Sequence, residues 1–278
     1  MKSRIAAITF AAIVAACAGG SPTTAPATST QATPAPTNAA SVELNILAAA
    51  SLKGALDKAK TAYEASHAGV TLTISTDSSA ALETKIEQGA PVDVFLSADT
   101  TNPKKLVDGG FADGAAINFA GNKLTVIVPK DNPAGITSPA DLARAGVKVI
   151  AAGDEVPITK YATLLIQNLA KEAGYPAGFE AAYIANVVSK EENVKAVVAK
   201  IALGQGDVAI CYVTDAKAST DVLAIEVPAT ANVPATYAGV VVKTSTNADA
   251  ARAFLDWLAG AGGQAVLATF GFLPPIPA

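Results

Sequence analysis

Short apolar runs alternate with segments of helical periodicity from residue 42 almost to the end of the chain. The first pair is VELNILAAA (42–50), an apolar run that predicts a strand, and SLKGALDKAKTAYEAS (51–66), whose apolar residues recur at helical spacing. Further strands are predicted over 70–76, 92–98, 123–130, 147–153, 182–188, 207–213, 221–227 and 236–243, and further helices over 79–89, 101–110, 138–146, 158–173, 192–206 and 248–260, before a last short helix. Alternation of this density predicts an α/β fold, with mostly parallel sheets flanked by helices.

The first forty residues do not follow this pattern. Lys2 and Arg4 precede an apolar run over residues 5–16, which is too short to span a bilayer and is typical of an export signal. The run ends in VAAC, which resembles a bacterial lipobox, the motif whose cysteine receives diacylglycerol and becomes the new N-terminus. We therefore expect Cys17 to carry lipid.

The segment that follows Cys17 separates this interpretation from that of an ordinary signal peptide that happens to contain a cysteine. Residues 18–40 contain no charge, no large aliphatic side chain and no aromatic ring. Such a stretch cannot bury apolar surface and is typical of a solvated tether. We predict a signal peptide over residues 1–16 and a lipidated cysteine with its disordered tether over residues 17–41.

Composition excludes several classes of protein. The net charge is −4 without any basic run, which argues against nucleic acid as a partner. Only Cys211 remains beside Cys17, so no disulfide framework is expected. The single histidine, His67, cannot build a histidine-rich zinc site or a Ser-His-Asp triad, and no G-x-S-x-G, H-E-x-x-H or Walker A motif occurs. We expect no cofactor and no metal cation site.

Helix starts are the candidate binding features. Open α/β sheets bind ligands at the carboxyl ends of their strands, where the next helices begin. Ser51, the pair Ser78–Ser79, residues 154–157 and residues 189–193 each occupy such a place. The unpaired N–H groups of a helix N-terminus attract anions. Taken singly, each serine is better explained as a plain helix cap, and these residues alone do not specify the anion.

Four segments resemble the periplasmic molybdate-binding proteins of ABC importers, which are type 2 solute-binding proteins. They are AAASL (48–52), SSAALETKIEQGAPVDVFLSAD (78–99), GQGDVAICYVTDA (204–216) and ATFGFLPP (268–275). The resemblance implies a periplasmic-binding-protein fold of two lobes with the ligand in the cleft between them. Lobe one would comprise 42–122 plus 240–278, and lobe two 123–239, with 123–130 and 236–243 as crossing strands that form the hinge.

The same resemblance implies a site made of neutral hydrogen-bond donors. Ser51 and Ser79 would each offer a hydroxyl and a backbone N–H, Ile158 and Val194 a backbone N–H, and Tyr212 its phenolic O–H. Ile158 stands in VPITKYA, where the family pattern favours a loop of small residues, so this chain departs from the pattern at that point.

The resemblance implies binding of molybdate or tungstate outside the cytoplasm and delivery to a membrane permease, with no catalysis. We expect a monomer anchored to the membrane through Cys17. A binder of another tetrahedral oxyanion, such as sulfate, is the nearest alternative. Sugar binders usually offer aromatic stacking faces, which we do not expect in a chain with 5% aromatic residues and its single tryptophan, Trp257, on a C-terminal helix. A hydrolase with Ser51 or Ser79 as nucleophile would lack a histidine to activate it.

Overall fold

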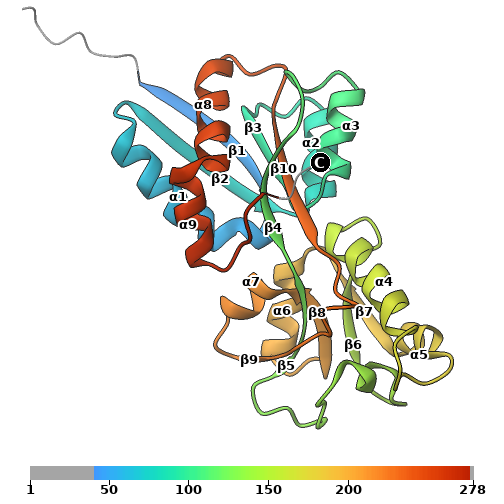
Figure 1. Ribbon diagram of the computed structural model, residues 1–278. Helices are drawn as coiled ribbons and strands as arrows, with labels where there is room; N and C mark the ends of the chain where they lie inside the picture. Colours follow the sequence, from blue (N-terminus) through green and yellow to red (C-terminus); the bar gives the residue numbers. More distant parts are fainter. Residues whose placement is uncertain (1–40, 276–278) are drawn as a thin grey trace, which may run out of the picture. The chain divides into compact units, whose positions relative to one another are not determined.

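Two five-stranded sheets make up the part of the chain that the computed structural model describes, residues 41–275 (Figure 1). These residues belong to one compact unit, residues 39–278. The predicted signal peptide, Cys17 and all but the last residue of the tether lie outside the described residues.

The first sheet contains the strands nearest the start of the chain. Their order across the sheet is β2 (Val70–Asp77), β1 (Val42–Ala49), β3 (Val94–Ser97), β10 (Ala235–Val241) and β4 (Ile117–Asn122). Strands β1, β2 and β3 pair in parallel, and β10 runs antiparallel to both β3 and β4. One strand therefore runs against the other four.

The second sheet repeats this arrangement. Its order is β7 (Val187–Glu191), β6 (Val149–Ala152), β8 (Val208–Tyr212), β5 (Leu124–Pro129) and β9 (Val222–Ile225). Strand β6 is parallel to β7 and β8, whereas β5 is antiparallel to β8 and β9. The predicted α/β class with mostly parallel sheets is confirmed.

Helices flank both sheets (Figure 1). The 3₁₀ turn η1 (Ala50–Leu52) and helices α1 (Lys53–Ser66), α2 (Ser79–Glu87), α3 (Thr101–Asp108), α8 (Ala248–Ala259) and α9 (Ala261–Thr269) accompany the first sheet. The 3₁₀ turn η2 (Pro139–Ala143) and helices α4 (Pro157–Leu169), α5 (Phe179–Asn186), α6 (Val194–Ala202) and α7 (Val213–Lys217) accompany the second. Helix α1 shows why they form, because its buried residues Ala55, Leu56, Ala59 and Tyr63 recur at helical spacing along one face.

The chain passes between the sheets twice. In the first passage, Lys123 alone separates the end of β4 from the start of β5. The second passage follows β9 and ends at Ala235, where β10 begins. Residues 235–239 pair with β3 and β4 of the first sheet, although the sequence analysis had assigned them to the second lobe.

The prediction was wrong for one apolar run. Residues 182–188 were predicted to be a strand, but residues up to Asn186 belong to α5 and the strand β7 starts only at Val187. Helix α5 begins with the buried Phe179 and continues through an alanine-rich stretch, and alanine is the strongest helix former. The run is not a buried strand, since Ile184 is 61% exposed.

Three other elements also differ from the prediction. Strand β4 and the short helix α7 were not predicted, and the helix expected over 138–146 is only the 3₁₀ turn η2. Strand β4 contains Gly121 and ends in a polar residue, so its pattern is not that of an apolar strand. Its pairing with β10 fixes it instead.

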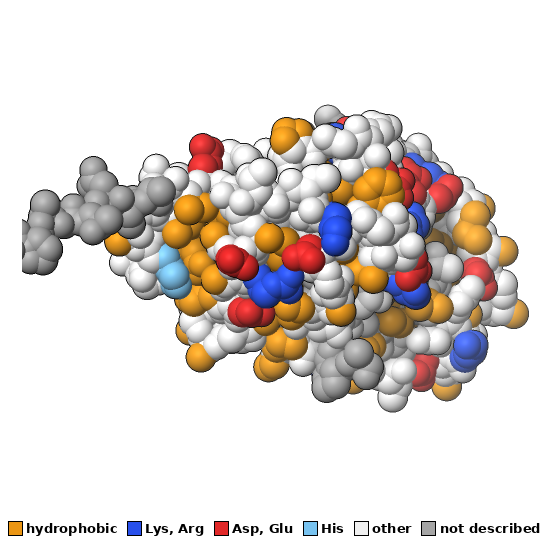
Figure 2. All heavy atoms as spheres, turned by 90° about the horizontal axis from the view of Figure 1, so that it is seen from above, with side chains coloured by type: hydrophobic (Ala, Val, Ile, Leu, Met, Phe, Trp, Pro, Cys, Tyr) orange, Lys and Arg blue, Asp and Glu red, His pale blue; other side chains and the backbone are white. Residues whose placement is uncertain are grey.

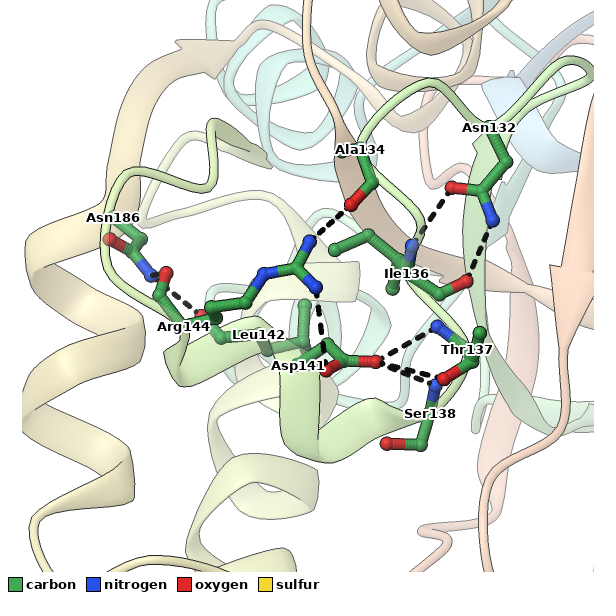
Figure 3. Close-up of polar contacts among 9 residues, drawn as sticks. All are labelled: Asn132, Ala134, Ile136, Thr137, Ser138, Asp141, Leu142, Arg144 and Asn186. Atoms are coloured by element: carbon green, nitrogen blue, oxygen red, sulfur yellow. Dashed lines mark hydrogen bonds and ion pairs between the residues drawn. The ribbon is translucent and has the colours of Figure 1, made fainter.

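Side-chain bonds to the backbone stabilise the segment around η2 (Figure 3). Asp141 accepts hydrogen bonds from the N–H groups of Thr137 (2.8 Å) and Ser138 (3.0 Å) at the start of the turn. Asn186, the last residue of α5, donates to the carbonyl oxygens of Leu142 (2.8 Å) and Arg144 (2.9 Å). These two bonds attach the end of α5 to η2.

The surface is of mixed charge. Figure 2 shows acidic and basic side chains interspersed on the face in view, with no area given over to one sign. Within residues 41–275, no helix combines the length and the hydrophobicity needed to cross a membrane.

Candidate anion-binding site

A small cavity lies where the carboxyl ends of six strands meet. Strands β1, β2 and β3 of the first sheet and β6, β7 and β8 of the second all lead into segments that line it. Its volume is about 10 Å³, roughly the room for one water-sized sphere. All five positions predicted from the sequence line this one cavity, and each is almost completely buried: Ser51, Ser79, Ile158, Val194 and Tyr212. Their role in binding remains a prediction.

Backbone N–H groups at three helix starts border the cavity. Ser79 is the first residue of α2, Val194 the first of α6, and Ile158 the second of α4. N–H groups in the first turn of a helix have no partner within the helix and carry partial positive charge. Neither α2 nor α4 has a side-chain cap, and the cap of α6, Asn193, accepts from Ala196 and leaves the Val194 N–H unbonded by it. The arrangement suits an anion.

The hydroxyl of Ser79 is held so that it can donate. Its Oγ accepts a hydrogen bond from the backbone N–H of Ala98, at 3.1 Å. A hydroxyl has one hydrogen and two acceptor lone pairs, so this bond leaves the hydrogen free for a ligand. The hydroxyl of Ser51 instead lies 2.9 Å from the hydroxyl of Tyr237.

Two other hydroxyl groups lining the cavity are buried with no partner among residues 41–275. They are Tyr212 Oη and Ser78 Oγ. Burial raises the pKa of Tyr212 well above its usual value, so the phenol keeps its proton and can donate. A buried polar group without a partner costs free energy, which a ligand oxygen placed against these hydroxyls would recover. Ser78 was recognised only as part of a helix start, and its burial depends on tertiary packing that the sequence pattern does not reveal.

The lining residues include neither lysine, arginine nor histidine. The one charged residue among them, Asp77, already has partners on both oxygens. Its Oδ1 accepts from the N–H of Ser78 at 2.8 Å, and its Oδ2 lies 3.2 Å from Lys85 Nζ. A bound anion would therefore be held by dipoles and hydrogen-bond donors, and not by an opposite charge.

A buried carboxylate follows Tyr212, a lining residue, three positions along the chain. Asp215 lies in α7, the short helix that directly follows β8. Its side chain is fully buried, and one of its oxygens lies 2.9 Å from Lys195 Nζ. Burial raises the pKa of Asp215, and Lys195 only partly opposes this effect. The sequence analysis did not single out Asp215, because nothing in its neighbours along the chain marks it as buried.

The site offers no evident catalytic chemistry. Neither serine lies against a general base, and the only histidine, His67, caps the far end of α1, where it stacks on Tyr63. Within residues 41–275, no three histidine, cysteine, aspartate or glutamate side chains are grouped as metal ligands would be. What the arrangement can do is donate hydrogen bonds to a small ion enclosed between the two sheets.

Comparison with known proteins identifies the family. The family model for bacterial extracellular solute-binding proteins matches residues 44–273. The chain is 32% identical over 272 residues to the molybdate-binding protein ModA of Mycobacterium tuberculosis H37Rv, which covers 98% of this chain and 96% of that protein. It is 29% identical to YvgL of Bacillus subtilis, which carries the provisional name of an ABC transporter substrate-binding lipoprotein, with coverage of 83% and 86%.

Two solved structures are similar in fold. The sulfate-binding protein SubI of Mycobacterium tuberculosis has a TM-score of 0.75 at 25% identity, covering 84% of this chain and 88% of SubI. The periplasmic molybdate-binding protein of Azotobacter vinelandii has a TM-score of 0.71 at 23% identity, covering 84% of this chain and all of that structure.

Proposed function

This chain belongs to the bacterial extracellular solute-binding proteins, and we propose that it captures molybdate or tungstate outside the cytoplasm and delivers the ion to an ABC importer. Similarity to ModA over nearly the whole chain supports this choice of ligand. The observation that carries the proposal is the enclosed cavity lined by donors, in which the buried hydroxyls of Tyr212 and Ser78 have no partner among the described residues. The protein acts in transport and not in catalysis.

The hydroxyl and backbone N–H donors that line the cavity predict which anions it selects. Hydroxyls can turn their hydrogen toward a ligand, and backbone N–H groups can only donate. Molybdate, tungstate and sulfate are fully deprotonated near neutral pH and offer only acceptor oxygens. Phosphate keeps at least one proton at this pH, and that proton would meet a donor, at a cost of about 1–3 kcal/mol. Sulfate fits the donor pattern but is smaller than molybdate, so it reaches fewer donors.

Sulfate is the second candidate, because the fold is also similar to that of the sulfate-binding protein SubI. Calorimetric titration of the protein with molybdate, tungstate, sulfate and phosphate in one buffer tests both candidates. We expect molybdate and tungstate to bind with similar affinity, sulfate much more weakly and phosphate negligibly. Sulfate binding as tight as molybdate would overturn the choice of ligand, and micromolar binding of phosphate would overturn the shell of donors.

The binding unit is proposed to work as a monomer with two lobes. All five predicted donors come from one chain, two of them beside the first sheet and three beside the second. The predicted division into 42–122 plus 240–278 and 123–239 is kept as a proposal, with its second boundary moved to the start of β10 at Ala235 because of the strand pairing.

Membrane anchoring through lipid on Cys17 is a further part of the proposal. The VAAC motif, the uncharged stretch after it and the similarity to YvgL support it. In a bacterial host, wild-type protein should enter the detergent phase of a detergent phase separation, whereas Cys17→Ser should be uncleaved or released. Cys211→Ala is the matched control and should behave as wild type. Wild-type protein found in the aqueous phase would contradict the anchor.

A further inference from the structure

A chain of hydrogen bonds leads from the passages between the sheets to Ser51. Asn122 is the last residue of β4, and Tyr237 lies in β10, so both lie beside places where the chain changes sheet. Asn122 Nδ2 is 3.4 Å from Tyr237 Oη, which is 2.9 Å from Ser51 Oγ. Asn122 and Tyr237 are buried, and neither lines the cavity.

The direction of this chain follows from Asn122. Its Oδ1 accepts from the backbone N–H of Lys123 at 2.9 Å, and an N–H can only donate. This bond fixes which end of the amide is nitrogen. Nδ2 therefore faces Tyr237 and also Thr214, whose Oγ1 it meets at 2.9 Å. Since Nδ2 can only donate as well, Tyr237 Oη must accept from it.

Tyr237 in turn must donate to Ser51. Burial, and then the carboxylate of Asp215, raise the pKa of Tyr237 well above its usual value, so the phenol keeps its proton. That hydrogen needs an acceptor, and Ser51 Oγ is the one within reach among the described residues. Ser51 Oγ thus receives a hydrogen on one side, and its own hydrogen is left to point into the cavity.

We infer that Asn122 and Tyr237 are positioning residues which hold the Ser51 hydroxyl as a donor toward the bound oxyanion and thereby exclude ligands that carry a proton on that oxygen. This inference rests on the proposed function. An anion oxygen without a proton completes the chain. A protonated oxygen would need Ser51 to accept, and the serine hydrogen would then have no acceptor inside a closed cavity.

Two variants test the inference through selectivity, with molybdate and inorganic phosphate as probes. Tyr237→Phe removes the hydrogen that Ser51 receives but offers the serine hydrogen no other acceptor, so molybdate should bind about tenfold more weakly while phosphate stays undetectable. Asn122→Asp places an acceptor beside Tyr237 and should reverse the chain. Ser51 would then donate to Tyr237 and present a lone pair to the ligand, so in this variant phosphate should become detectable and gain relative to molybdate.

Tyr161→Phe is the matched control. It removes another largely buried phenolic hydroxyl, which bonds to the carbonyl oxygen of Thr236 at 3.4 Å and not to Ser51. The ring of Tyr161, which has an edge contact with the ring of Tyr212, is kept in this variant. Its preference for molybdate should equal that of wild type. Thermal melting of each variant establishes that it is folded before the titrations are compared.

The outcomes separate this inference from the proposed function. Phosphate that stays undetectable in Asn122→Asp, or unchanged molybdate affinity in Tyr237→Phe, overturns the positioning role while wild-type molybdate binding stands. Wild-type protein that binds no oxyanion of the panel overturns the proposed function and this inference with it.

Discussion

Two hydroxyl groups that line the cavity differ in their hydrogen bonds when no ligand is bound. The Ser79 hydroxyl satisfies the N–H of Ala98, whereas the Tyr212 hydroxyl has no partner in the described part of the chain. Both are proposed to donate to the anion. Removing each should therefore have a similar effect on binding but a different effect on stability.

Ser79→Ala and Tyr212→Phe should each lose a hydrogen bond to a charged oxygen, about 1.5–3 kcal/mol, or roughly tenfold to a hundredfold in molybdate affinity. Without ligand, Ser79→Ala should lower the free energy of unfolding, because the buried Ala98 N–H loses its acceptor. Tyr212→Phe should leave that free energy unchanged or raise it, since the lost hydroxyl satisfied no other group. Calorimetry and chemical denaturation measure the two quantities, and wild-type affinity in both variants would refute the site.

The burial of Asp215 predicts how the stability of the protein depends on pH. Because burial raises its pKa in the folded protein, folding binds a proton to it over the interval between the unfolded and folded pKa values. The buried Asp215 carboxylate therefore does not lower the free energy of unfolding below the unfolded pKa. Its destabilising effect grows as the pH rises through the folded pKa. Asp215→Asn removes the buried charge and leaves Lys195 partly exposed, with about a third of its side chain accessible.

The variant should therefore gain stability over wild type as the pH rises. Denaturation midpoints of both proteins at pH 4 and pH 7 measure the change. A stability difference that does not vary with pH, or that favours wild type more at pH 7 than at pH 4, would show that Lys195 outweighs the effect of burial.

At the scale of elements, the starts of helices could be predicted from the sequence, and their convergence could not. Ser79, Ile158 and Val194 each follow a strand within a few residues, a local pattern that the family resemblance reinforced. The fold class and the family are confirmed. Residues 182–188 show the limit of the method, because an apolar run there belongs mostly to an exposed helix end.

Contacts between distant residues lay beyond the sequence pattern. Ser51 and Tyr237 are 186 positions apart, and Asn122 and Tyr237 are 115 apart. Strand β4 likewise takes its form from β10. Such pairings depend on how the chain returns to the first sheet, which no local periodicity encodes.

The start of α6 allows a backbone donor to be tested. Val194 is the first residue of this helix, a position where proline is favoured because its fixed φ suits the helix and no intrahelical bond is lost. Asn193 before it has extended backbone angles, φ −157° and ψ 169°, which a following proline requires. Val194→Pro should therefore fold normally and lack the N–H that we propose faces the anion, although its side chain also differs from valine.

We expect Val194→Pro to bind molybdate roughly tenfold to a hundredfold more weakly, with a melting temperature close to that of wild type. Val194→Ala is the control, because it trims the side chain but keeps the N–H, and its affinity should stay within a few fold of wild type. Equal losses in the two variants would assign the effect to side-chain packing and not to the backbone donor.

On the scale of the whole binding unit, the cavity is enclosed by segments from both sheets. All five predicted donors are at most 5% exposed. An ion cannot reach groups this deeply buried unless the segments of the two sheets separate, and only two short passages of chain join the sheets. Entry and release therefore require the sheets to move relative to each other.

Ligand binding should shift this motion toward the closed state. Donors beside the first sheet, Ser51 and Ser79, and those beside the second, such as Tyr212, can reach one ion together only when the cavity is closed, so the ion binds that state more tightly and populates it. Small-angle X-ray scattering should give a smaller radius of gyration with saturating molybdate than without. Tyr212→Phe should show the same decrease at a correspondingly higher molybdate concentration, because its donors still come from both sheets. A scattering profile that saturating molybdate leaves unchanged would contradict closure around the ion, even if calorimetry showed that the ion binds.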